Sequence, residues 1–95
     1  MIVMTETATL QIVMAGKKIE KTLMVDPLMT IEQALDNVEE YKALRTKLFD
    51  SKDDPQKYLS IMLNGKSIDY SNGMSTVIKA NDSLNILPKV SGGSF

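Results

Sequence analysis

The sequence predicts an α+β fold in which a mixed five-stranded sheet carries one main helix on one face. Three observations support this prediction: two pairs of alternating segments are each joined by a glycine turn, an amphipathic segment lies between the pairs, and one further alternating segment follows. The 95 residues suffice for one hydrophobic core. We therefore expect a single domain over residues 1–95, with a frayed N-terminus (1–6) and a flexible C-terminal tail (89–95).

Composition narrows the classes of function. The net charge of -1 gives no broad basic field for nucleic acid or anionic lipid, and no apolar run approaches a membrane span, so we expect neither partner and a cytoplasmic location. The chain has no cysteine and no histidine, which removes disulfides, thiolate nucleophiles and the usual soft zinc ligands. We expect no catalytic residue, no cofactor and no metal site.

The first two strands are expected at residues 7–14 and 18–25. Leu10, Ile12 and Met14 alternate with Thr9, Gln11 and Val13, and Gly16 supplies a tight reversal between the two segments. In the second segment Lys21 falls on the apolar face. A lysine at such a position predicts an edge strand, where the long side chain reaches water.

A helix is expected over residues 31–48, after Asp26-Pro27 ends the second strand. Thr30 and Gln33 have the spacing of a capping box. Carboxylates lie toward the start of this segment and basic residues toward its end, which favours the helix dipole, and we interpret them as a solvated face rather than a catalytic pair. One apolar face recurs every three or four residues: Ile31, Leu35, Val38, Tyr41, Leu44 and Leu48.

The second half predicts another hairpin and a last strand. Residues 49–57 form a polar loop whose three aspartates, Asp50, Asp53 and Asp54, lack the register of a calcium loop, so we expect an exposed connection. Asn64-Gly65 is a strong hairpin signal between strands at 58–63 and 66–70. Residues 74–80 predict an irregular or short helical crossover. The last strand is expected at 83–87, with Pro88 ending regular pairing.

Placing the last strand beside the first gives the sheet order 2-1-5-3-4, which is the β-grasp architecture. In this arrangement Val13, Met62 and Leu87 point outward on three adjacent central strands, on the face opposite the helix. A contiguous apolar group next to the root of the tail predicts a partner surface, to which we add Pro88.

The tail contains Gly92 and Gly93, which have no side chains to bury and can thread into a narrow active-site channel of another protein. Two runs carry a resemblance: Leu63-Asn64-Gly65, and residues 81–93 with the sequence Asn-Asp-Ser-Leu-Asn-Ile-Leu-Pro-Lys-Val-Ser-Gly-Gly. They resemble the C-terminal half of the MoaD/ThiS sulfur-carrier proteins, which are ubiquitin-like β-grasp proteins.

The resemblance implies a carrier without catalysis of its own. An ATP-dependent adenylyltransferase of the ubiquitin-activating type would adenylate the carboxylate of Gly93, which is then converted to a thiocarboxylate that donates sulfur to an accepting enzyme. Val90, Ser91 and Gly92 would form the extended tail that delivers Gly93.

This chain departs from the family pattern at its end, because Ser94 and Phe95 follow Gly93 and leave it with an amide. Some members resemble this chain in carrying a short extension, often Cys-Phe, that a zinc-dependent JAMM-type peptidase removes. The resemblance therefore implies a processing site between Gly93 and Ser94. Two alternatives stay open: a ubiquitin-like modifier conjugated through Gly93 to a lysine, and a β-grasp interaction module whose tail has no role.

Overall fold

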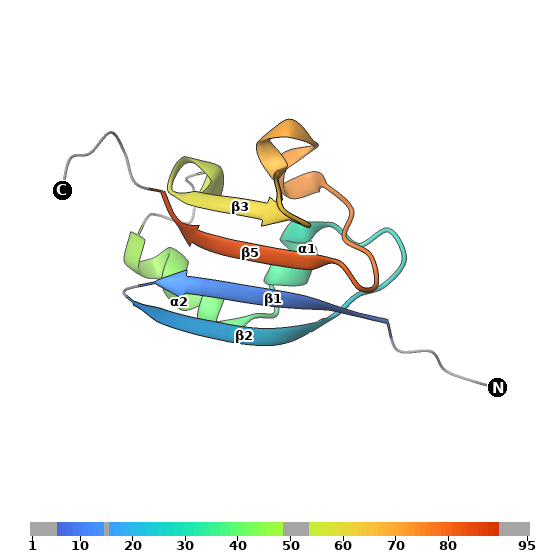
Figure 1. Ribbon diagram of the computed structural model, residues 1–95, viewed down its shortest axis with the longest axis horizontal. Helices are drawn as coiled ribbons and strands as arrows, with labels where there is room; N and C mark the ends of the chain where they lie inside the picture. The colour runs from blue at the N-terminus through green and yellow to red at the C-terminus, as the bar shows by residue number, and fades with distance from the viewer. Residues whose placement is uncertain (1–5, 15, 49–53, 90–95) are drawn as a thin grey trace.

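The computed structural model describes residues 6–14, 16–48 and 54–89 of the chain. Its sheet has the order β2-β1-β5-β3-β4, with β1 and β5 parallel and the other neighbours antiparallel (Figure 1). The predicted fold class and strand order are confirmed. The elements are β1 (Thr7–Met14), β2 (Lys17–Met24), α1 (Ile31–Leu35), α2 (Glu39–Leu48), the 3-10 turn η1 (Pro55–Lys57), β3 (Leu59–Leu63), β4 (Lys66–Ser67), the 3-10 turns η2 (Ile68–Tyr70) and η3 (Gly73–Ser75), and β5 (Ser83–Pro88).

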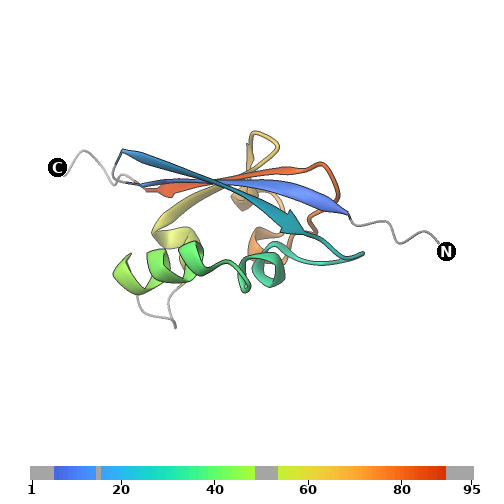
Figure 2. The same ribbon diagram turned by 90° about the horizontal axis from the view of Figure 1, so that it is seen from below.

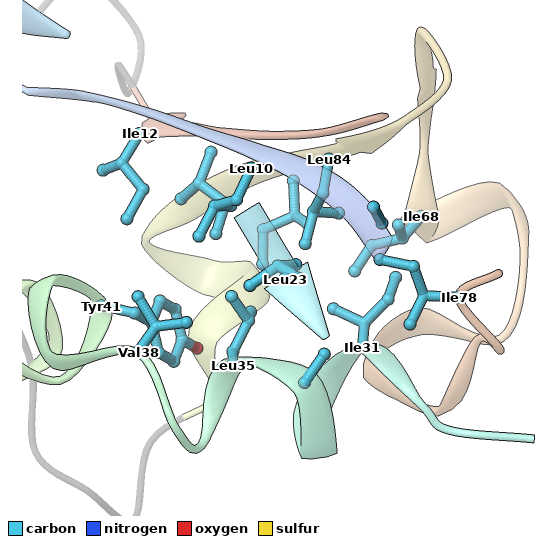
Figure 3. Packing of buried hydrophobic residues seen from close by; sticks show 14 of the residues in the cluster. Leu10, Ile12, Leu23, Ile31, Leu35, Val38, Tyr41, Ile68, Ile78 and Leu84 are labelled. Carbon is cyan, nitrogen blue, oxygen red and sulfur yellow. The ribbon is translucent and has the colours of Figure 1, made fainter. Parts of the chain in front are cut away.

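Both helices cover the same face of the sheet, which leaves the other face without a covering layer from the described residues (Figure 2). The core lies between these two layers, and its members come from every strand except β4 (Figure 3). Every buried residue in the described ranges is hydrophobic, and the hydroxyl of Tyr41 is the polar group among their side chains. The largest fully buried ones are Tyr41, Leu10, Ile12, Ile31, Leu35, Leu44, Leu59, Ile61, Ile68, Ile78, Leu84 and Ile86.

The helical segment begins as predicted but is divided in two. The Thr30 side chain accepts a hydrogen bond from the Gln33 amide at 3.2 Å, and the Gln33 side chain accepts one from the Thr30 amide at 2.9 Å. The continuous helix expected over 31–48 is interrupted at Asp36, Asn37 and Val38, where the Val38 amide donates to the Leu35 carbonyl in a tighter turn. Asp and Asn compete with the backbone of a helix interior, so the chain changes direction there while keeping Val38 buried.

Four strands differ from the prediction at one end or both. β2 lies one residue earlier than expected and β3 begins one residue later, whereas the ends of β4 and β5 differ for a structural reason. The fourth strand pairs only at Lys66 and Ser67, because Ile68 turns into the core and begins η2. Pro88 belongs to β5 instead of ending it: Pro88 pairs with Leu59. The pairing of β1 with β5 ends at Ile12 and Ile86. Pro88 has no amide proton, but it lies beyond this pairing, so no hydrogen bond between β1 and β5 is lost.

The edge position of β2 explains its lysine. Lys21 lies on the outermost strand, as predicted, and its Nζ reaches Glu40 Oε2 on α2 at 3.0 Å. This ion pair joins the sheet edge to the helical layer. The hydrogen bond from the Lys21 ammonium, with the Glu40 backbone amide as the next contributor, lowers the pKa of the Glu40 carboxyl.

Candidate functional site: the outer sheet face and the tail root

The tail residues proposed from the sequence lie outside the described residues. These are Val90, Ser91, Gly92, Gly93 and Ser94. The structure does describe the segment that precedes them, residues 87–89, which we call the tail root. The tail root begins with the last two residues of β5, which lies at the centre of the sheet between β1 and β3 (Figure 1). The start of the tail is therefore attached to the most enclosed strand of the fold.

The outer face is the sheet face away from the helices. On β5, Leu84 and Ile86 are fully buried, whereas Asn85 and Leu87 alternate to the outer face, where Leu87 is 37% exposed. On one side, Leu87 pairs with Ser60 of β3. On the other side, Ile86 pairs with Ile12 of β1, so the next residue of β1, Val13, lies level with Leu87.

Met62 lies one pair further along the outer face, beside Asn85. Both Val13 and Met62 are half-buried. Val13, Met62 and Leu87 therefore occupy three adjacent strands, interleaved with Ser60 and Asn85. This surface mixes apolar and hydrogen-bonding groups, as interfaces that form and dissociate commonly do.

Pro88, which the sequence analysis grouped with these residues, alternates to the other side of β5. It pairs with the buried Leu59 and follows Ile86 by two positions, so strand alternation places it on the helix side of β5 rather than beside Leu87 on the outer face. Within the tail root, Leu87 is the residue that offers an apolar side chain to the outer face.

A polar cluster at the tail root was not anticipated from the sequence. Lys89 Nζ donates to the Gln56 carbonyl at 2.6 Å and lies 3.8 Å from Asp69 Oδ2. The Gln56 side-chain amide donates in turn to the Asp69 carboxylate. Lys89 and Gln56 are 33 residues apart, so no local spacing could have shown this contact. We call Gln56, Asp69 and Lys89 the root cluster.

A cleft of about 430 Å³ lies between the helices and the turns η1 and η3, and Gln56 of the root cluster lines one part of it. Tyr41 lines it and is only 2% exposed, and its hydroxyl has no hydrogen-bond partner among the described residues. Burial raises the pKa of Tyr41 to about 12, against the opposing effect of the Arg45 guanidinium, which lies 5.9 Å from the ring centroid. Over the described ranges, no group of three or more acidic, cysteine or histidine side chains is arranged to hold a metal ion.

These features define the class of protein. A mixed sheet in the order β2-β1-β5-β3-β4, with helices on one face and the central last strand leading into the tail, is that of a ubiquitin-like β-grasp protein. The family model of ThiS matches residues 6–93, and the chain belongs to the ThiS family. The family that the sequence resembles is thereby confirmed, while no curated protein sequence matches the chain.

Solved structures share this fold. The small archaeal modifier protein 1 (SAMP1) of Methanosarcina acetivorans is 24% identical with a TM-score of 0.68, covering 96% of this chain and 100% of that one. SAMP1 of Haloferax volcanii is 21% identical with a TM-score of 0.67, covering 92% and 99% of the two chains. A chain of the Amycolatopsis orientalis BexX/CysO complex is 22% identical with a TM-score of 0.62, covering 90% and 99%.

None of the helices in the described part of the chain combines the length and the apolar character needed to cross a membrane.

Proposed function

We propose that this protein is the precursor of a sulfur carrier whose working end is Gly93. The observation that carries the proposal is the match to the ThiS family, which extends to Gly93 and leaves Ser94 and Phe95 beyond it. The attachment of the tail root to the central strand gives further support, because the chain that leads to the glycines leaves the sheet at its centre, next to the uncovered outer face.

Processing comes first in the proposed sequence of reactions. A JAMM-type zinc peptidase hydrolyses the amide between Gly93 and Ser94, which releases the dipeptide Ser-Phe and gives Gly93 a carboxylate. A carboxylate is a poor electrophile, so an ATP-dependent adenylyltransferase then joins it to AMP as a mixed anhydride and releases pyrophosphate. Sulfide (HS⁻) displaces AMP to give the thiocarboxylate. The thiocarboxylate passes this sulfur to an accepting enzyme, and water restores the Gly93 carboxylate.

The protein itself supplies recognition and delivery, and no catalytic group of its own takes part. Leu87, Val13 and Met62 on the outer face contact the adenylyltransferase, while the glycines pass into its nucleotide site because they have no side chains. Since the reaction consumes ATP, we place the protein in the cytoplasm.

A second candidate is a ubiquitin-like modifier. In this case a lysine amine attacks the activated Gly93 and forms an isopeptide bond, so the first reactions are the same. The names of the similar SAMP1 structures, which are modifier proteins, favour this candidate. A β-grasp interaction module without tail chemistry is the remaining alternative.

Intact mass spectrometry of the protein purified from its own cell separates these functions. A carrier loses Ser-Phe and exchanges one oxygen for sulfur, whereas a modifier is recovered attached to other proteins. Recovery of only the full-length, unmodified chain from cells that contain the peptidase and the adenylyltransferase would exclude both functions. In vitro, a chain ending at Gly93 should support pyrophosphate exchange by the adenylyltransferase, and the full chain should not.

A further inference from the structure

The backbone is held at two points where it leaves the sheet. The Lys89 amide donates to the Tyr58 carbonyl at 2.8 Å, which continues the β3–β5 ladder one residue past Pro88. The Lys89 side chain then reaches Gln56 and Asp69, which lie on η1 and η2 outside the sheet. The last described residue is thus fixed by its backbone and by its side chain at the same time.

The groups that hold Lys89 are themselves fixed. The Gln56 amide donates to Asp54 Oδ1 at 3.0 Å, and the Asp69 amide donates to Ser67 Oγ at 3.2 Å, so both residues sit in capped turns. Gly73 lies against the Gln56 side chain: a Cβ at Gly73 would approach Gln56 Oε1 to 2.6 Å, and its φ of +58° is also a conformation that favours glycine.

We propose that the root cluster, Gln56, Asp69 and Lys89, is a positioning device that sets the point from which the tail reaches into the adenylyltransferase. The inference rests on the proposed function. Gly93 is the fourth residue after Lys89, so the working end can lie no further than about 14 Å from a fixed anchor. If Lys89 were released, a longer stretch of chain would have to be ordered in the nucleotide site, at a cost in conformational entropy.

This role differs from docking in what it changes. Contacts of the outer face act on the affinity of the two proteins, whereas the root cluster acts on the fraction of docked complexes whose Gly93 lies in reach of ATP. Loss of the cluster should therefore lower kcat for adenylation and leave KM unchanged. Because Lys89 and Asp69 are each partly exposed, with 42% and 48% of their side-chain surfaces accessible, we expect a decrease of about three- to tenfold in kcat.

The test uses the chain ending at Gly93 and steady-state adenylation with the cognate adenylyltransferase. Lys89→Met keeps the length of the side chain and removes the ammonium, and Lys66→Met, an exposed lysine on β4, is the matched control. We expect the decrease in kcat for Lys89→Met and Asp69→Asn, no change for Lys66→Met, and recovery in Lys89→Arg. An unchanged kcat, or a raised KM with normal kcat, would overturn the proposal.

A measurement without the enzyme tests the same cluster. Hydrogen exchange of the Lys89 amide should be several times faster in Lys89→Met than in the parent chain, while the Ile86 amide keeps its protection. Equal exchange at Lys89 in both proteins would show that the side chain does not hold the tail root. If the parent chain is not adenylated at all, the proposed function fails, whereas normal adenylation of the parent and of every variant rejects the positioning role alone.

Discussion

Ile86 and Leu87 are neighbours on the central strand, yet they belong to opposite faces of the sheet with different tasks. Ile86 is fully buried against the helices, while Leu87 is 37% exposed on the outer face. The inner face is apolar along all three central strands, whereas polar side chains are interleaved with apolar ones on the outer face. The inner face holds the fold together. Residues of the outer face are less constrained by packing and can serve recognition.

The largest effect on stability is expected from truncating a buried side chain on the inner face of β5. Ile86→Ala should lower the free energy of unfolding by about 2–5 kcal/mol, because it removes buried methyl groups and leaves a cavity. Leu87→Ala is the matched variant on the outer face and should cost less than about 1 kcal/mol. Urea denaturation of both proteins measures the difference. Equal losses would show that the two faces are not distinct in packing.

Stability at alkaline pH should depend on the buried Tyr41, which belongs to the helical layer. The folded protein keeps the proton of Tyr41 up to about pH 12, while the unfolded chain loses it near pH 10.0, so ionisation favours the unfolded state over this interval. Stability should be unaffected by this group below pH 10 and should fall from there to about pH 12. Tyr41→Phe should remove this part of the loss, and Tyr70→Phe, at a residue that is 90% exposed, should leave it in place. Thermal melting at several alkaline pH values provides the measurement.

On the outer face, a charge should affect recognition more than folding. Leu87→Asp should change the free energy of unfolding by less than about 1 kcal/mol and weaken binding to the adenylyltransferase at least about tenfold, since it places a carboxylate in the docking surface. Binding can be measured by calorimetry, with Lys66→Asp as a charge control away from the three central strands. Global unfolding of Leu87→Asp would contradict the assignment of faces on β5.

The smallest effect is expected at the ion pair between Lys21 and Glu40. Hydrogen bonding to Lys21 lowers the pKa of Glu40, so the pair stabilises the folded state above the ordinary carboxyl pKa of 4.5, and this contribution is lost as pH falls through the lowered value. In Lys21→Met the Glu40 pKa, followed by NMR, should rise. Melting temperatures of the two proteins should differ little at neutral pH and converge under acid conditions.

Local chemistry made most of the fold predictable. Asn64-Gly65, the Thr30 and Gln33 pair, and the alternation in the strands each specify an element through contacts over a few residues, and their order leaves few topologies. The break at Asp36 and Asn37 was harder to predict, since the apolar spacing runs through it and only the path of the chain over the sheet requires a turn.

The same distinction between local and long-range contacts applies to the candidate site. Leu87, Val13 and Met62 could be assigned to the outer face because strand alternation and strand order together determine which side chains share a face. Pro88 was grouped with them through its position in sequence, although the alternation of β5 places it on the other side. Lys89 and its partners were missed because Gln56 on η1, Asp69 on η2 and Lys89 after β5 are distant in sequence and meet only in the folded chain.

The parallel pairing of β1 with β5 also bears on the time at which the tail becomes usable. β5 is the last strand of the described chain and lies at the centre of the sheet, so β1 and β3 have no neighbour between them until it is in place. During synthesis, β1 with β2 and β3 with β4 cannot join into one sheet until β5 has been made. The pairing of β5 with β1 that joins them is among the contacts most distant in sequence. Only a molecule that has completed its sheet therefore offers both the outer face and a fixed tail root to a partner, and an incomplete chain offers neither.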